Sequence, residues 1–127
     1  ARAPACAGKH RTAADAARMR EETRCDGVMV GRGSMGAPWL VGQIDAALSG
    51  LPIPVTPAPG ARIALAKEQL LALIEARGDH GLLIARKHMN WTCCGIPGAS
   101  QFRQQLMRAP SPAAAIDLLD QQMQQIQ

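Results

Sequence analysis

Residues 28–39 read VMVGRGSMGAPW, in which an apolar run leads directly into Gly31-Arg32-Gly33. Glycines let backbone N–H groups approach an anion closely, and an arginine adds a forked, permanently charged donor that suits phosphate. Pro38 fits the first turn of a following helix, whose positive N-terminal end also favours an anion. The pattern predicts a phosphate-binding loop between a strand and a helix. The alternative interpretation is a turn with a solvated arginine.

A second set of residues with possible chemistry lies in ARKHMNW, near residue 88. On a helix, Arg86, Lys87 and Asn90 share one face, and Trp91 lies one turn beyond Lys87. Such a face could follow an RNA backbone while an aromatic ring stacks on an exposed base. Arg103 is a further candidate for a phosphate contact. The alternative is that the charges are the solvated side of an amphipathic helix, and for Trp91 we expect a position in the core.

The cysteines do not form a metal-binding pattern. No C-x-x-C pair occurs among the four cysteines, which are Cys6, Cys25, Cys93 and Cys94. His88 precedes Cys93 by a spacing that zinc sites do not use. We therefore expect structural thiols and no metal. The sequence shows no secretory signal and no long apolar run, which indicates a cytoplasmic protein without a membrane segment.

The elements that position these residues fall on either side of SGLPIPVTPAPG, residues 49–60. Its prolines cannot lie inside a helix and indicate an extended linker. Before it, we expect a helix capped by Thr12, a short strand at residues 28–30 buried on both faces, and a helix ending near Leu48. Residues 1–10 offer at most one weak strand candidate. The chain also begins without Met, and we expect this half to be the last part of a larger α/β domain.

After the linker the pattern is helical throughout. Apolar residues recur at helical spacing and predict helices near residues 61–77, 80–94 and 99–108, followed by a last helix that Ser111 caps. The residues expected to face inward are Ile63, Ala66, Leu70, Ile74, Leu82, Ala85, Met89, Phe102, Leu106, Ile116, Leu119, Met123 and Ile126. Short connections between these segments favour a small antiparallel four-helix bundle.

Composition is compatible with this organisation and leaves the partner open. The chain has 127 residues, 47% of them hydrophobic and 19% charged, which favours a folded core over disorder. The net charge of +4 is compatible with an anionic partner but is shared equally between the two halves. Charge alone therefore does not establish nucleic-acid binding.

Two stretches resemble one known family. TAADAARMREETRCDGVMVGRGSMGAPWLVGQI resembles the end of the barrel in bacterial tRNA-dihydrouridine synthases, especially the B-type branch with its nitrogen-regulation-associated relatives. LLIARKHMNWTCCGIPGASQFRQQL resembles the C-terminal helical domain of the same family. The resemblance covers about residues 8–120. It implies the C-terminal end of a flavin-binding (β/α)8 TIM barrel over residues 1–48, the linker over residues 49–60, and a helical tRNA-binding domain over residues 61–127.

The resemblance also implies cofactors and site residues. The family's Gly-Arg pair at the FMN phosphate falls on Gly31 and Arg32, and its other phosphate loop falls on Ala7-Gly8-Lys9, where Gly8 is retained. NADPH or NADH would reduce FMN, and a hydride would pass to C6 of a uridine in tRNA while a cysteine protonates C5. That cysteine would lie upstream, so we expect no catalytic residue in this chain and no activity from it alone. Arg86, Lys87 and Arg103 would contact RNA phosphates.

Two other functions remain open from the residues themselves. The chain could be a non-catalytic helical RNA-binding module attached to the remnant of a barrel. The helices could instead form a protein-interaction domain. The sequence leaves the oligomeric state open.

Overall fold

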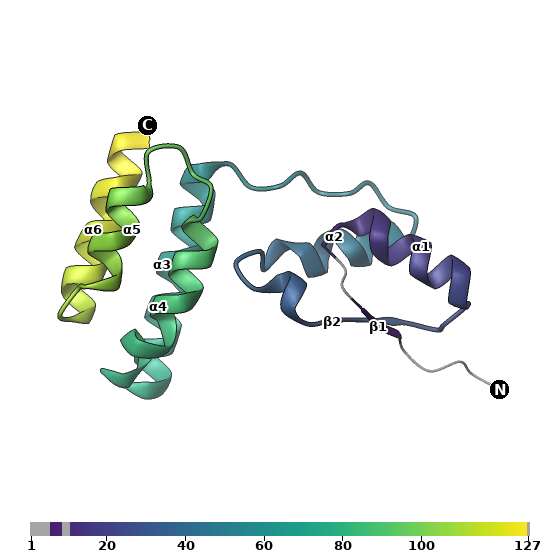
Figure 1. Ribbon diagram of the computed structural model, residues 1–127, viewed down its shortest axis with the longest axis horizontal. Helices are drawn as coiled ribbons and strands as arrows, with labels where there is room; N and C mark the ends of the chain where they lie inside the picture. The colour runs from purple at the N-terminus through teal and green to yellow at the C-terminus, as the bar shows by residue number, and fades with distance from the viewer. Residues whose placement is uncertain (1–5, 9–10, 127) are drawn as a thin grey trace. The chain divides into compact units, whose positions relative to one another are not determined.

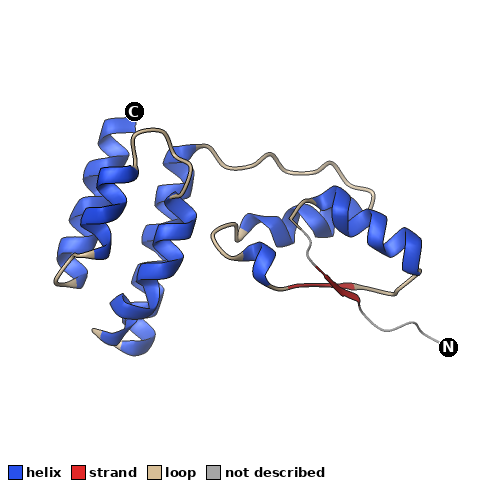
Figure 2. Cartoon of the chain, viewed as in Figure 1, coloured by secondary structure: helices blue, strands red, loops and turns tan. Residues whose placement is uncertain are grey.

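The computed structural model describes residues 6–8 and 11–126. The chain divides into two compact units, of which the first ends at Thr56 and the second begins at Pro57. Helices make up most of the second unit, and the described strands lie in the first (Figure 2).

The first unit is built around a parallel pair of short strands. Its elements are β1 (Cys6–Gly8), α1 (Ala13–Thr23), β2 (Val28–Val30), the 3-10 turn η1 (Arg32–Ser34) and α2 (Trp39–Leu48). The two strands pair in parallel, with Cys6 opposite Val28 and Gly8 opposite Val30. Because α1 connects them, the segment is a β-α-β unit that continues into α2 (Figure 1). The weak strand candidate near the start of the chain is therefore a real strand.

Local signals define both ends of α1. The Thr12 hydroxyl accepts a hydrogen bond from the Asp15 N–H at 3.1 Å, which confirms the predicted N-cap. The Asp15 carboxylate accepts from the Arg11 N–H at 3.2 Å, and chiefly this bond lowers the pKa of that carboxyl below its usual value. The helix ends at Arg24, which takes a left-handed φ of 55° and donates its N–H to the Arg20 carbonyl.

Both helices of the first unit pack on the same face of the strands (Figure 1). The core consists of Ala13, Ala16, Leu40 and Ile44, with Val28 and Val30 against it. Met29 points to the opposite face and is 59% exposed. The prediction that this strand is buried on both faces is therefore wrong for this chain, because successive strand residues alternate between faces and the helices cover only one.

The described residues of the second unit form the helices α3 (Pro59–Arg77), α4 (His80–Cys93), α5 (Ser100–Met107) and α6 (Pro112–Ile126). The first of these begins inside the predicted linker, because Pro59 needs no N–H at a first helical position. The Ser111 hydroxyl accepts from the Ala114 N–H at 3.2 Å, as its predicted capping role requires. All these helices contribute to one apolar core.

The buried stripes of α3 and α4 agree with the predicted ones, and that of α6 agrees in part. Ile63, Ala66 and Leu70 are buried on α3, and Leu82, Ala85 and Met89 are buried on α4. On α6, Leu119 is buried, and Ile116 and Met123 are partly buried and pack against the core. Ile126 is 36% exposed, so the prediction is wrong for this residue, which lies at the C-terminal end of the helix.

Gly81 sets how closely α3 and α4 approach. A Cβ at this position would lie 2.3 Å from the Leu73 carbonyl oxygen and 2.8 Å from the Ile74 nitrogen. Both atoms belong to the backbone of α3, so neither can rotate away from the added Cβ as the end of a flexible side chain could. Gly81 is therefore required by close packing, and any larger residue would force the two helices apart.

We predict that Gly81→Ala lowers the free energy of unfolding of the second unit by about 2 kcal/mol or more, as overpacking does. Gly60→Ala is the matched control, because Gly60 also lies in a helix of this unit and its added Cβ meets no atom within 4 Å. The control should gain roughly 0.5 to 1 kcal/mol from its higher helix propensity. Trp91 fluorescence during urea unfolding in a Trp39→Phe background measures both. Equal stability of the two variants would contradict the steric role of Gly81.

Arg62 ties the first turns of α3 to the C-terminal end of α4. Its guanidinium donates to the Thr92 carbonyl at 2.7 and 3.1 Å and to the Cys94 carbonyl at 2.7 Å. The last carbonyls of a helix have no partner within it, and a cation there also complements the helix dipole. In the first unit, Arg20 similarly donates to the Leu48 carbonyl at 3.0 Å. Neither contact between helices follows from a local sequence pattern.

Candidate functional site

The predicted phosphate loop follows β2 directly. The Ser34 N–H and hydroxyl both donate to the Gly31 carbonyl, at 3.1 and 2.8 Å, and the Met35 N–H donates to the Arg32 carbonyl at 3.1 Å. These bonds close the turn through carbonyl oxygens. The chain then enters α2, where the Leu40 N–H bonds the Ala37 carbonyl. The predicted order of strand, glycine-arginine turn and helix is therefore present.

The strand register brings Gly8 and Gly31 to the same edge of the sheet. Gly8 pairs with Val30, so the carboxyl ends of the two strands lie next to each other. Ligands of α/β folds bind at this edge. No described atom lies within 4 Å of the place a Cβ would take on Gly31, so its backbone is open to an approaching group. Lys9, the next residue of the second predicted phosphate loop, lies outside the described residues.

Arg32 is exposed, and within the described part of the chain no hydrogen bond or ion pair holds its guanidinium. A guanidinium beside open glycine backbone can donate two parallel hydrogen bonds to a phosphate. The arrangement at this edge suits an anion such as a phosphate group, with open backbone at Gly31 and positive charge from Arg32.

The predicted RNA-contacting residues lie along α4 and α5. Arg86 is half-buried and donates to the Ala109 carbonyl at 3.0 Å, just beyond the end of α5. Arg103 on α5 donates to the Asn90 side-chain oxygen of α4 at 3.4 Å. Lys87 is exposed on the neighbouring face of α4. Arg86 therefore has a structural contact as well as a place on the polar face, and Arg103 lies beside the same part of α4.

Neither arginine is fully satisfied by these contacts. The Nε atoms of Arg86 and Arg103 are buried and have no hydrogen-bond partner among the described residues. A buried donor left unpaired costs about 1 to 3 kcal/mol. Because these Nε atoms are buried, a phosphate that approaches from solvent would have to bind the terminal nitrogens of the two guanidinium groups.

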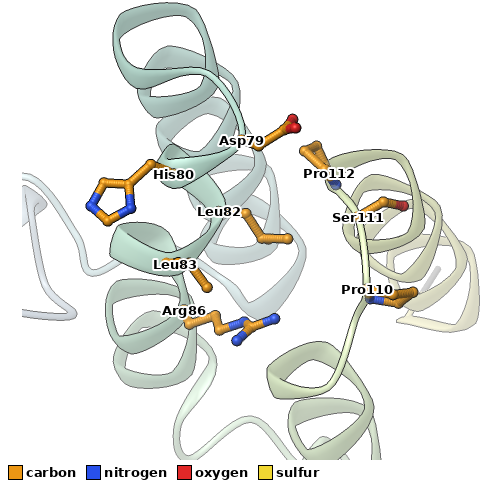
Figure 3. Close-up of a pocket in the computed structure, with 8 residues that line it drawn as sticks. All are labelled: Asp79, His80, Leu82, Leu83, Arg86, Pro110, Ser111 and Pro112. Carbon is orange, nitrogen blue, oxygen red and sulfur yellow. The ribbon is translucent and has the colours of Figure 1, made fainter.

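A hollow of about 410 Å³ lies beside Arg86, between α4 and the loop that leads into α6 (Figure 3). The residues that line it are Asp79, His80, Leu82, Leu83, Arg86, Pro110, Ser111 and Pro112. In Figure 3, Arg86 extends toward the loop at Pro110, whereas the His80 ring points away from Ser111. The side chains that line the hollow therefore do not place a nucleophile, such as the Ser111 hydroxyl, next to a base such as His80. The hollow extends the surface around Arg86 and has no catalytic arrangement of its own.

Charge is distributed unevenly within the second unit. Residues 80–116 contain Arg86, Lys87, Arg103 and Arg108 and no aspartate or glutamate. The acidic residues of the unit are Glu68, Glu75, Asp79, Asp117 and Asp120. One of them, Asp120, pairs with Lys67 at 2.7 Å across α3 and α6. The segment from α4 to α5 is therefore uniformly basic, which favours an anionic partner.

Trp91 does not occupy the core, so that expectation is wrong. It is 38% exposed, and its ring meets that of His88 edge to face, with centroids 5.6 Å apart and planes at 81°. Its neighbours Thr92 and Cys93 are buried instead. The inward stripe of α4 thus continues past Met89 through small residues, which leaves the indole at the surface.

The described cysteines do not provide an activated thiol. Cys93 is fully buried, and this burial raises its pKa to about 11, although the charges of Arg62 and Arg103 act in the opposite direction. Cys25 is also buried, and Cys94 is exposed. Among the residues that the structure describes, no group of His, Cys, Asp and Glu side chains could hold a metal ion.

None of the described helices is long and apolar enough to cross a membrane.

The first unit belongs to the α/β class of proteins, with parallel strands, connecting helices and an anion-suited loop at the carboxyl edge. The dihydrouridine synthase family model matches residues 6–127. The chain therefore belongs to the dihydrouridine synthase family, a TIM-barrel family, which confirms the resemblance in both stretches of sequence.

Curated relatives agree with this assignment. A probable tRNA-dihydrouridine synthase 1 of Synechocystis sp. is 43% identical over 101 residues, which cover 80% of this chain and 28% of the relative. A probable tRNA-dihydrouridine synthase of Rhodobacter capsulatus is 41% identical, over 84% of this chain and 33% of the relative. The tRNA-dihydrouridine synthase B of Pseudomonas aeruginosa is 38% identical, over 69% of this chain and 27% of the relative. The chain thus spans about a third or less of the length of these relatives.

We predict that at about pH 8 a thiol reagent labels the exposed Cys94 quickly in the folded chain, whereas Cys93 and Cys25 react only on unfolding. Both of these thiols are buried, and the raised pKa of Cys93 further disfavours its thiolate. Mass spectrometry of labelled peptides in a Cys6→Ser background gives the rate at each site. A Cys93 rate within a few-fold of the Cys94 rate would contradict the burial of this thiol.

Proposed function

We propose that this chain is the C-terminal part of an FMN-dependent tRNA-dihydrouridine synthase, a cytoplasmic enzyme that reduces uridine to 5,6-dihydrouridine in tRNA with NADPH or NADH. The family match across residues 6–127 is the observation that carries the proposal. The curated relatives are between about two and a half and three times as long as this chain, so their remaining length would supply most of the barrel.

The first unit would be the last part of that barrel. In a TIM barrel the helices cover the outer face of the strands, and the inward side chains fill the interior. Val28 and Val30 pack on the helices, and Met29 points to the uncovered face, as this arrangement requires. The exposure of Met29 supports the view that further strands complete the interior in the longer protein.

The carboxyl edge of these strands would bind the FMN phosphate. Gly31 and Gly8 would let the phosphate approach the backbone, and Arg32 would neutralise its charge. Bound FMN would supply the hydride for the C5–C6 bond of uridine, with NADPH or NADH as the reductant. The support is the shared edge, the open space at Gly31 and the exposed guanidinium of Arg32.

The basic residues of α4 and α5 would hold the tRNA. Lys87 is exposed and free to reach a phosphate, while Arg86 and Arg103 are partly exposed on α4 and α5. The absence of acidic residues from residues 80–116 supports the same surface. We call the surface formed by Arg86, Lys87 and Arg103 the basic face. The target uridine would leave its stack to reach the flavin while this face holds the rest of the RNA.

A non-catalytic RNA-binding role is the second candidate. It rests on the uniformly basic segment of residues 80–116, which could bind RNA without a flavin. Activity of the longer protein that contains this sequence separates the two functions. Formation of dihydrouridine in transcribed tRNA supports the enzyme, whereas bound RNA without turnover, with FMN and NADPH present, supports the binding module.

We predict that Arg32→Ala in that longer protein lowers its content of bound FMN after purification, because the phosphate loses its charged partner. The loss should be about tenfold in FMN affinity, and Arg32→Lys should restore part of it. Arg18→Ala is the control, since Arg18 is an exposed arginine of the same unit that pairs with Asp15 on the surface. Flavin fluorescence during titration measures the affinity. An unchanged affinity in Arg32→Ala would remove Arg32 from the site.

We predict that replacing Arg86 and Lys87 by alanine in this chain weakens tRNA binding and lowers the slope of log affinity against log salt by about 1 to 2, because each lost phosphate contact releases fewer counterions. A double variant at Arg18 and Arg77 removes the same charge elsewhere and is the control. Filter binding over a range of salt concentrations gives both slopes. Equal slopes for the two double variants would contradict the basic face.

A further inference from the structure

We propose that Trp91 is a stacking platform for an unpaired RNA base, placed one helical turn from the phosphate contact at Lys87. The inference rests on the proposed RNA binding of the basic face and adds the kind of RNA that this face selects. It assigns a role to a residue that the core of the second unit does not use.

The exposed side of α4 is a continuous stripe. His80, Leu83, Lys87 and Trp91 are exposed and recur at intervals of three or four residues, so they lie one above the other. The stripe lies apart from the core residues Leu82, Ala85 and Met89, which are buried. A phosphate held by Lys87 would therefore have the Trp91 indole beside it, at the next turn of the helix.

The contact with His88 holds the indole in place without covering it fully. The two rings meet at 81° with centroids 5.6 Å apart, so they are not stacked in parallel. In such a geometry His88 engages at most one face of the indole. At least one face of Trp91 is left outside this contact, and the partial exposure of the side chain makes it available to a ligand.

The charge around Trp91 favours RNA over a protein as the partner. The surrounding segment, residues 80–116, carries four arginine and lysine side chains and no acidic one. The other large apolar side chain exposed on the stripe is Leu83, at 53%. A protein interface would need a broader apolar patch, whereas an aromatic ring next to cations suits a nucleotide.

The base must be unpaired. Within a helix both faces of a base are covered by its neighbours, and RNA-binding aromatics stack on bases that loops, bulges and ends expose. Trp91 would therefore favour a hairpin loop or an extruded nucleotide over a fully paired duplex, while Lys87, Arg86 and Arg103 would bind both through phosphates.

The test uses the 127-residue chain with Trp39→Phe, so that Trp91 is its remaining tryptophan. Its fluorescence is followed during titration with an RNA hairpin and with a blunt duplex of equal charge. We expect quenching with the hairpin and little with the duplex. Trp91→Ala should weaken hairpin binding about tenfold or more, as loss of base stacking does, with an unchanged salt slope. Trp91→Phe, which retains a ring, should bind within a few-fold of the parent.

The controls separate this inference from the proposed function. Leu83→Ala removes an exposed apolar side chain from the same stripe and should leave hairpin affinity unchanged. If Lys87→Ala weakens binding and Trp91→Ala does not, the stacking role is overturned while RNA binding stands. If no variant differs because the parent binds no RNA, both proposals fail. Loss of self-association in Trp91→Ala without loss of RNA affinity would assign the residue to a protein contact and also overturn the inference.

Discussion

The packing of α4 against α3 is the constraint on which the proposed activity of the second unit depends. At one end of α4 the missing side chain of Gly81 lets the two backbones meet. At the other end the Arg62 guanidinium donates hydrogen bonds to the Thr92 and Cys94 carbonyls. With both ends held, α4 cannot rotate, and its buried stripe determines which residues face water. The exposure of Lys87 and Trp91 is therefore a consequence of contacts that neither residue makes.

An equivalent constraint in the first unit is the parallel register of β1 and β2. A shift of one residue would move Val28 and Val30 off the helices and separate Gly8 from the end of β2. In the observed register, packing and site agree: Val28 and Val30 face the helices, and the pairing of Gly8 with Val30 brings Gly8 and Gly31 to one edge. The loop at Arg32 can hold an anion there while the reacting groups of the family would come from the rest of the barrel.

Sequence reasoning was most successful where the determining interaction is local. The caps at Thr12 and Ser111 and the alternation of Leu82, Ala85 and Met89 act within one or two turns, and the structure has each of them. The order of strand, Gly31-Arg32 turn and helix could be predicted because adjacent residues determine it, and the structure has this order, whereas anion binding by the turn stays a prediction. Gly8 joins them only through strand pairing, and its place in the loop came from family resemblance.

The features that were missed depend on distant partners. Arg62 bonds carbonyls about thirty positions away, and Arg86 bonds one at Ala109, so no local pattern reports either contact. Trp91 was expected inside because large aromatics usually pack in cores, but its outward direction is set by the rotation of α4. Met29 was expected to be covered because its strand resembles a buried one, and in this chain helices cover a single face.

The central claim is that the basic face and Trp91 together form the RNA-binding surface of the second unit. Backbone amide and indole N–H resonances of the isotope-labelled chain, recorded as an RNA hairpin is added, test it most directly. If these residues bind RNA, the largest shifts will fall on Lys87, the Trp91 indole and Arg103, with little change around Glu68 and Glu75 on α3. Shifts confined to α3 and α6, or no shifts at RNA concentrations that saturate binding, would contradict it.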